Sequence, residues 1–249
     1  MSKNTIHYIS PKELTLKDLA MINEGKLTIE LSDEAKTKIE RCREYLDQKL
    51  KESNHPIYGI NTGFGSLYNK HIPHGQLEKL QENLVKSHAC GTGPEVPEEI
   101  VRLMLFLKVQ SISYGYSGVQ LATVQRLAKM FNEDILPVIY EMGSLGASGD
   151  LAPLAHLALP LIGLGEVVYQ ENKFSGEAIN QKLQWTPLVL EAKEGLALLN
   201  GTQFMSAYGV WCTLHAHQLL KLANIIGALS LDAFDGRIDP FLPQVNAIR

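Results

Sequence analysis

The glycine-rich run from residue 143 to residue 154 gathers small residues around a serine and a carboxylate. It contains Ala147-Ser148-Gly149, followed directly by Asp150 and then by an apolar stretch that begins at Leu151. Average usage produces Ala-Ser-Gly by chance in about one chain of this size in ten, so the tripeptide alone identifies no chemistry. A tight turn before a helix, with Asp150 as a negative charge at the helix N-terminus, also explains the run.

Three distant segments carry further polar residues that could take part in chemistry. Tyr58 opens Tyr-Gly-Ile-Asn-Thr-Gly-Phe-Gly, His88 ends Asn-Leu-Val-Lys-Ser-His, and Asn200 lies within Leu-Leu-Asn-Gly-Thr-Gln. Each also has a purely structural explanation. Tyr58 could be a surface tyrosine whose ring packs on the protein and whose hydroxyl is solvated. His88 could cap carbonyls at the end of a helix, and Asn200 could be the C-cap of a helix before glycine.

Together, these four segments resemble the signature of the histidine and phenylalanine ammonia-lyase family, and the resemblance extends over essentially the whole chain. In that family the tripeptide cyclises to 4-methylidene-imidazol-5-one. The resemblance implies that the Gly149 nitrogen reaches the Ala147 carbonyl carbon, an approach that glycine permits, and that Ser148 loses its hydroxyl. The product is a protein-derived electrophile, which ordinary side chains do not supply. Asp150 is implied to shuttle protons during this maturation.

The resemblance also implies roles for the other three residues. Tyr58 matches the family's catalytic tyrosine and is the expected base for the β-proton; because tyrosine ordinarily titrates near pH ~10, its surroundings would have to lower its pKa. Ser87-His88 resembles the selectivity pair of the histidine-specific members, so His88 is expected to contact the imidazole or carboxylate of the substrate. Asn200 is expected to hydrogen-bond the prosthetic ring and the substrate. The glycines after Tyr58 favour loop closure over substrate.

The implied reaction is non-oxidative elimination of ammonia from L-histidine to give trans-urocanate, in histidine degradation. An aminomutase and an aromatic amino-acid ammonia-lyase are alternatives, although Ser87-His88 argues against the mutase. The family pattern continues beyond residue 249 with an arginine for the substrate carboxylate and a later carboxylate, so the chain corresponds to its N-terminal part. A truncated or split chain, inactive alone and acting as an assembly partner, is therefore a further alternative. The implied partners are further copies in a homotetramer or a complementary C-terminal polypeptide.

The elements that must position these residues are mostly helices. Apolar residues at helical spacing and capping signals predict helices over 15–25, 32–54, 77–88, 98–114, 118–132 and from 151, strands over 5–9 and 27–31, and a β-hairpin over 166–175. A long loop is expected over 59–75, and no helix is expected in 235–249. We expect a mainly α chain, one helical unit over 1–249, which the resemblance makes the N-terminal portion of a fumarase/aspartase-like fold with long central helices.

Composition and the missing motifs exclude several other classes. A formal charge of -4 without a basic stripe argues against nucleic acid, and three cysteines without a CxxC pair argue against a disulfide framework or thiolate zinc site. His215 with His217, and His71 with His74, lack the geometry or third ligand of a metal site. No GxSxG, GxGxxG or P-loop motif is present, so no nucleotide cofactor is expected. The apolar stretches 151–164 and 208–234 are expected to be buried core helices rather than membrane spans, and the cytoplasm is the expected location.

Overall fold

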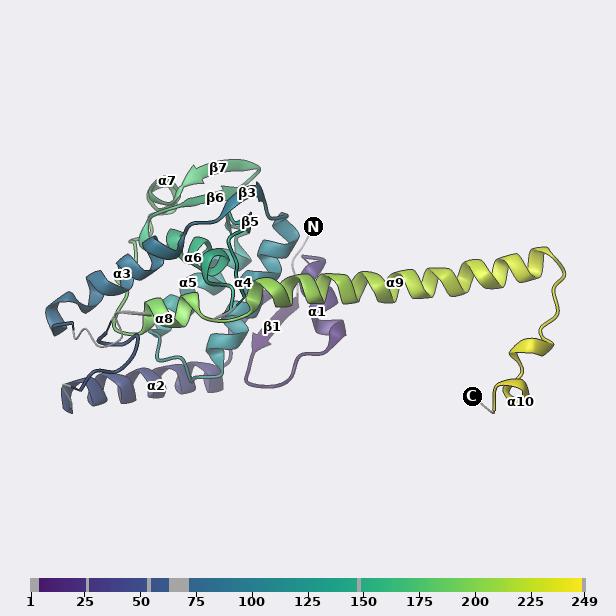
Figure 1. The fold of residues 1–249 in the computed structure, drawn as a ribbon, viewed down its shortest axis with the longest axis horizontal. Helices are drawn as coiled ribbons and strands as arrows, with labels where there is room; N and C mark the ends of the chain where they lie inside the picture. The colour runs from purple at the N-terminus through teal and green to yellow at the C-terminus, as the bar shows by residue number, and fades with distance from the viewer. Residues whose placement is uncertain (1–4, 26, 53–54, 63–71, 147–148, 248–249) are drawn as a thin grey trace. The chain divides into compact units, whose positions relative to one another are not determined.

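The computed structural model describes residues 5–25, 27–52, 55–62, 72–146 and 149–247 (Figure 1). The chain divides into two compact units, Met1–Tyr208 and Gly209–Arg249, and each is described by itself. The expectation of one mostly helical unit over 1–249 stays a prediction. The prediction of a mainly helical fold is confirmed.

The N-terminal segment forms the two strands predicted for it, with a short helix between them. β1 (Thr5–Ile9) pairs in parallel with β2 (Leu27–Leu31), and α1 (Leu16–Asn23) connects them. Thr15 and Asp18 form the predicted capping box, in which the Thr15 hydroxyl accepts the Asp18 N–H at 3.2 Å and the Asp18 carboxylate accepts the Thr15 N–H at 2.9 Å.

The predicted amphipathic helix is α2 (Asp33–Glu52), and the Ser32 hydroxyl caps it by accepting the Ala35 N–H at 3.2 Å. Ala35, Ile39, Leu46 and Leu50 of its apolar stripe are buried, and Cys42 is partly buried. After a short 3-10 turn, η2 (His74–Gln76), comes α3 (Leu77–His88), which ends at His88 as predicted. Part of the long loop expected between these helices, residues 63–71, lies outside the described residues.

The centre of the first unit is α4 (Glu98–Ser113), which packs against α5 (Leu121–Asn132) and is buried on nearly every side. α5 starts three positions after the expected Gly118, because the buried Glu194 carboxylate determines its first turn. Glu194 Oε1 accepts the Gln120 N–H at 2.9 Å and the Thr123 hydroxyl at 2.6 Å, so a residue 71 to 74 positions away takes the place of an N-cap side chain.

Two small sheets cover one side of these helices (Figure 1). β3 (Thr92–Glu95) pairs antiparallel with β5 (Tyr140–Met142), and β6 (Glu166–Tyr169) lies between β4 (Leu136–Pro137) and β7 (Asn172–Ser175). The hairpin predicted over 166–175 is confirmed as β6 and β7. The β3–β5 pair was not predicted, since Gly93 and Pro94 interrupt any strand pattern and the partner strand is distant along the chain.

The remaining helices of the first unit surround the glycine-rich run. α6 (Leu151–Ala158) continues into the 3-10 helix η3 (Leu159–Ile162) and is followed later by α7 (Gly176–Lys182) and α8 (Glu194–Leu199). α6 packs against both α3 and α8, and its apolar side chains after Leu151 are buried. The prediction of a core helix starting at Leu151 is therefore confirmed.

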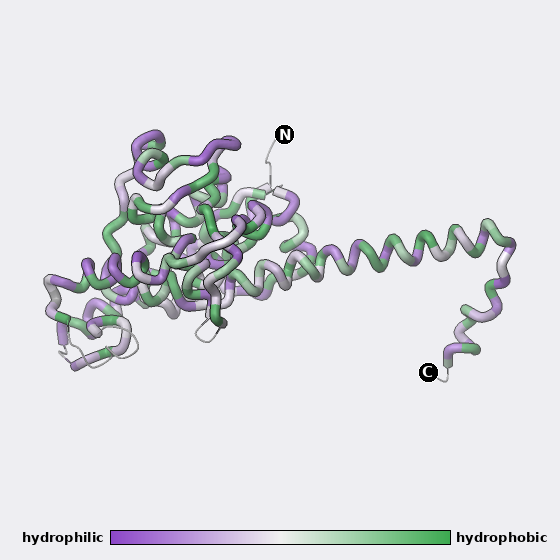
Figure 2. The backbone as a smooth tube through the Cα atoms, turned by 45° about the horizontal axis from the view of Figure 1, so that its top comes forward, coloured by the Kyte–Doolittle hydropathy of each residue, from purple (hydrophilic) through white to green (hydrophobic). Residues whose placement is uncertain are grey.

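The long helix α9 (Gln203–Ala233) begins in the first unit and makes up most of the second, before η4 (Asp239–Phe241) and α10 (Pro243–Asn246). Hydrophobic residues recur along it (Figure 2), but those from Leu219 to Leu229 are exposed. The prediction that stretch 208–234 is a buried core helix is thus wrong for this chain, because an apolar helix is buried only where another surface covers it. Two short helical turns also occur in 235–249, where none was expected. In the described parts of the chain, no helix has the length and apolar character of a membrane span.

Candidate active site

Two glycines from distant parts of the sequence lie backbone against backbone at the start of α6. Gly149 and Gly201 form a parallel β-bridge, and the Gly201 carbonyl accepts the N–H of the next residue, Asp150, at 2.8 Å. Gly149 has φ +94°, and a Cβ added to it would lie 2.2 Å from the Gly201 oxygen. No side chain fits there, so position 149 is restricted to glycine both by its conformation and by its neighbour.

The buried Asp150 carboxylate connects the start of α6 to the start of α9. It accepts the Ser144 hydroxyl at 3.0 Å through Oδ1 and the Met205 N–H at 3.0 Å through Oδ2. Asp150 occupies the N-cap position of α6, yet its side chain makes no capping bond to that helix. The negative charge expected at the N-terminus of the following helix instead lies at the N-terminus of α9, where free N–H groups favour an anion.

Asn200 ends α8 immediately before the bridged Gly201. Its backbone N–H and its side-chain Nδ2 both donate to the Leu196 carbonyl at 3.0 Å. Asn200 is therefore the C-cap of α8, as its position before a glycine predicted, and its side chain is fixed close to the Gly149–Gly201 bridge. Gln203, two residues after Gly201, is buried, and its Oε1 has no hydrogen-bond partner within the part of the chain that the structure describes.

Lys108 is a residue of this region that sequence reasoning missed. It lies in the middle of α4 and is 1% exposed, and its Nζ donates to the carbonyls of Ala197 at 2.8 Å and Asn200 at 3.0 Å. Burial lowers the pKa of this amine to about 7. A lysine within the apolar run Leu-Met-Leu-Phe-Leu-Lys-Val was the available signal, because lysine is almost never fully buried without partners.

His88 is held at the end of α3 by its own helix. Its Nδ1 lies 2.8 Å from the Leu84 carbonyl, which accepts and cannot donate, so Nδ1 carries the proton and Nε2 is the acceptor nitrogen of the neutral ring. The Ser87 hydroxyl donates to the same carbonyl at 3.1 Å and lies 3.2 Å from Nδ1. The carbonyl-capping role of the structural explanation is therefore present in the structure.

A second histidine, also missed from the sequence, links the segment after His88 to α6. His156 Nε2 accepts the Gly91 N–H at 3.0 Å, and its ring lies edge-on to Tyr140 with centroids 5.2 Å apart. Burial lowers the pKa of His156, which favours the neutral ring that this hydrogen bond requires. No local sequence pattern pointed to this residue, because its partner lies 65 positions away.

Tyr58 belongs to a turn that is anchored from within. The buried Asn61 side chain accepts the Ile57 N–H at 2.6 Å and donates to the His55 carbonyl at 3.0 Å. Ile60 packs into the apolar cluster formed by α2, α3 and Ala192. Tyr58 itself is 53% exposed. The turn is thus fixed on the core, while its aromatic side chain reaches solvent in this chain.

The structure brings together some of the predicted residues. Gly149, Asp150 and Asn200 meet at the bridge, and α3, which ends at His88, packs against both α6 and α8. The Tyr58 turn packs instead on the apolar cluster of α2, α3 and Ala192. Ala147 and Ser148 lie outside the described residues.

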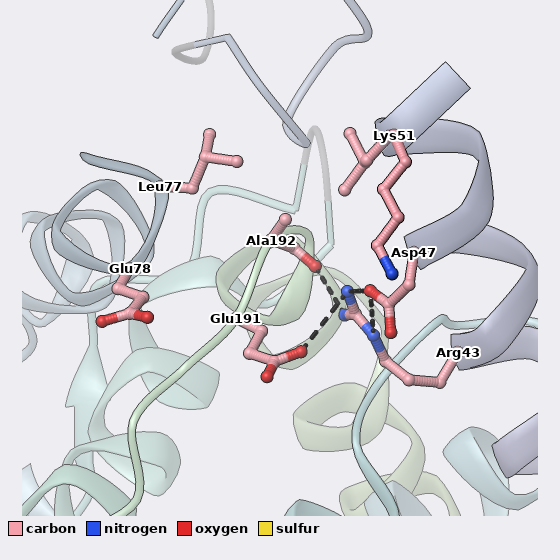
Figure 3. Close-up of a pocket in the computed structure, with 8 residues that line it drawn as sticks. Arg43, Asp47, Lys51, Leu77, Glu78, Glu191 and Ala192 are labelled. Carbon is pink, nitrogen blue, oxygen red and sulfur yellow. Dashed lines mark hydrogen bonds and ion pairs between the residues drawn. The ribbon is translucent and has the colours of Figure 1, made fainter. Parts of the chain in front are cut away.

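A pocket of about 280 Å³ lies between α2, α3 and the segment before α8, and none of the predicted site residues lines it. Arg43 dominates this pocket (Figure 3): it pairs with Asp47, lies 3.5 Å from Glu191 and donates to the Ala192 carbonyl at 2.9 Å. These partners occupy the Arg43 guanidinium with contacts within the chain. Arg43 therefore joins three elements, and the pocket is not a substrate site. Among the described residues, no group of three histidine, cysteine, aspartate or glutamate side chains could hold a metal ion.

Comparison with known proteins agrees with the four matching segments. A family model described as aromatic amino acid lyase matches residues 14–249. The chain is 42% identical over 238 residues to the histidine ammonia-lyase of Streptococcus gordonii, which covers 96% of this chain and 46% of that protein. The chain spans about half the length of the curated relatives it matches.

Solved structures give the same result. Histidine ammonia-lyase from Trypanosoma cruzi is similar with a TM-score of 0.90 and 37% identity over 98% of this chain and 48% of that chain. Tyrosine aminomutase from Streptomyces globisporus is similar with a TM-score of 0.89 and 34% identity over 95% of this chain and 44% of that chain. These matches confirm the expected fold, and the chain belongs to the aromatic amino acid lyase family, a family of carbon–nitrogen lyases.

Proposed function

We propose that this chain provides the electrophile-bearing half of an active site that eliminates ammonia from L-histidine to give trans-urocanate. The observation that carries the proposal is the Gly149–Gly201 bridge with Asp150 beside it, in a chain 42% identical to a histidine ammonia-lyase. Ser87-His88 supports histidine over an aromatic substrate, because the resemblance at this pair is to the histidine-specific members.

The residues around the bridge fit the prosthetic group that the resemblance implies. Gly149 has no room for a Cβ, as expected where its nitrogen must approach another backbone carbonyl. Once formed from Ala147, Ser148 and Gly149, the 4-methylidene-imidazol-5-one would supply an electrophilic carbon for attack by the substrate.

Formation of this group releases two waters. The Gly149 nitrogen adds to the Ala147 carbonyl carbon, and the former carbonyl oxygen leaves as the first water. Ser148 then loses its hydroxyl together with its α-proton as the second. Asp150, held by Ser144 and Met205, is the proposed proton shuttle because its carboxylate lies next to the reacting nitrogen in sequence and is fixed at both oxygens.

The other predicted residues act on the substrate in this proposal. Tyr58 removes the β-proton as general base, on a turn fixed by Asn61. His88, with Nδ1 held by Leu84, presents Nε2 as an acceptor to the substrate. Asn200 hydrogen-bonds the prosthetic ring and the substrate from the end of α8. Further copies in a homotetramer, or a complementary C-terminal polypeptide, supply the remaining residues in the cytoplasm.

An intact mass measurement and a product assay test the proposal separately. The purified chain is expected to weigh two waters less than its sequence, Ser148→Ala is expected to abolish the deficit, and Ser230→Ala on the exposed face of α9 is expected to retain it. A wild-type chain of full sequence mass would refute the electrophile. Incubation of the assembled protein with L-histidine should yield urocanate. A β-amino acid would indicate a mutase, and no product despite the mass deficit would indicate a chain that serves as an inactive partner.

A further inference from the structure

The buried amine of Lys108 connects the central helix α4 to the end of α8. Its two partners, the carbonyls of Ala197 and Asn200, are 89 and 92 positions away in sequence. Both belong to the C-terminal turn of α8, where backbone carbonyls lack partners within the helix. Lys108 therefore caps a helix from a different part of the chain.

Burying the Lys108 amine costs free energy that only its two hydrogen bonds can offset. Phe106 and Val109, close to it on α4, are fully buried and apolar, and among the described residues no carboxylate is paired with its amine. Burying an amine among apolar groups is unfavourable, and an apolar side chain of similar length would fill the same volume without that cost. The two carbonyl contacts are what distinguish lysine from such a residue.

These contacts fix the peptide that leads into the bridge. The carbonyl of Asn200 and the N–H of Gly201 belong to one planar peptide group, so the bond from Lys108 sets the orientation of that plane. The next carbonyl, of Gly201, accepts the Asp150 N–H at 2.8 Å and lies against Gly149. Asn200 Nδ2 and the Asn200 N–H both donate to the Leu196 carbonyl, so the residue whose carbonyl Lys108 holds is also fixed to the last turn of α8.

We propose that Lys108 is a positioning residue for maturation of the electrophile. By holding the Ala197 and Asn200 carbonyls, it keeps the Gly201 backbone against Gly149 and Asp150, where it restricts the glycine that must cyclise. Among the described residues, the Lys108 amine bonds the carbonyls of Ala197 and Asn200, so it acts on Gly149 through the backbone of Gly201. The effect on maturation rests on the proposed function, whereas the positioning of the Gly201 backbone rests on the Lys108 contacts alone.

The test compares Lys108→Met, which keeps the length and removes the donors, with Lys108→Arg, which keeps donors. Lys49→Met, at an exposed position on α2, is the control for a lysine-to-methionine change. Intact mass reports the fraction of chain that has lost two waters. Amide hydrogen exchange reports protection of the Asp150 N–H, with the Val124 N–H in α5 as an internal reference for the rest of the fold.

In Lys108→Met, exchange at Asp150 should accelerate about tenfold, which corresponds to about 1.4 kcal/mol, while Val124 stays protected. The two-water deficit should form more slowly or incompletely. Lys108→Arg should recover both properties, and Lys49→Met should match the wild type. A merely structural role would lower protection at both amides together.

Full maturation and unchanged Asp150 protection in Lys108→Met would overturn the proposal, as would equal loss at Asp150 and Val124. If Lys108→Met does not fold, Lys108→Gln replaces it, because its shorter amide cannot reach both carbonyls. Either of the two results just named, measured on Lys108→Gln, would then overturn the proposal. If the wild type shows no mass deficit, the proposed function fails by itself. Exchange then decides the role of Lys108: selective loss at Asp150 supports it, and no selective loss refutes it.

Discussion

Gly149 and Gly201 are so close that a Cβ on Gly149 would lie 2.2 Å from the Gly201 carbonyl oxygen. Their bridge joins the loop before α6 to the loop after α8. Each glycine also has a positive φ, of +94° and +142° respectively. The contact brings together two segments that are distant in sequence, at the place where α6 and α8 pack against each other.

Gly149→Ala should abolish the two-water mass deficit and destabilise the chain. A Cβ at 2.2 Å from a backbone oxygen forces the two segments apart, and the positive φ adds strain. Intact mass and urea unfolding measure the two effects.

The matched control is Gly146→Ala. Gly146 has a similar φ of +78°, but nothing lies within 4 Å of a Cβ added at this position, so it isolates the conformational cost. A Gly149→Ala variant no less stable than Gly146→Ala would contradict the steric explanation.

Asp150→Asn should fold but mature more slowly. One oxygen becomes an amide, so Ser144 and Met205 can no longer both donate to the side chain, and the proton acceptor is lost. We expect a destabilisation of about 1–3 kcal/mol, measured by urea unfolding, and a slower loss of two waters after refolding. Ser144→Ala removes one contact and keeps the carboxylate, so it should mature faster than Asp150→Asn. Maturation of Asp150→Asn at the wild-type rate would rule out the proton-shuttle role.

Asn61→Ala should loosen the turn that carries Tyr58. The change leaves the half-buried Ile57 N–H and the His55 carbonyl without the amide that now bonds both, at an expected cost of about 1–3 kcal/mol in unfolding free energy. Faster exchange at the Ile57 N–H would locate the effect. Asn172→Ala, at an exposed turn with one bond to the Gln170 carbonyl, should change the unfolding free energy by less than about 0.5 kcal/mol. Equal stability of the two variants would show that Asn61 does not anchor the turn.

His156 should make the chain less stable as the pH falls below neutrality. Burial lowers its folded-state pKa below the ordinary 6.5, so between these two values the unfolded state binds more protons and stability decreases with falling pH. The contribution is fully present above 6.5 and is lost as the pH drops through that window. His156→Gln, whose amide oxygen can accept the Gly91 N–H without titrating, should flatten the decline in urea midpoints between pH ~7 and pH ~5.

The pKa of His7 is also lowered by burial, so part of the decline should remain in His156→Gln. The informative quantity is the difference between wild type and variant at each pH. A difference that does not change with pH would mean that His156 is not the titrating group.

The sequence by itself determined the local elements and the family. The Thr15–Asp18 capping box and the apolar stripe of α2 were predictable because their signals lie within one or two helical turns. The four matching segments likewise predicted that Gly149, Asp150, His88 and Asn200 belong to one site. The structure brings Gly149, Asp150 and Asn200 together, and their roles stay predictions.

Tertiary structure alone decided which groups meet. The start of α5 depends on Glu194, the Asp150 carboxylate binds the start of α9 rather than its own helix, and Lys108 holds the end of α8. These partners are 55 to 92 positions apart, so no local pattern encodes them. They arise because packing of α4, α6 and α8 buries polar groups that must then find hydrogen-bond partners wherever the fold supplies them.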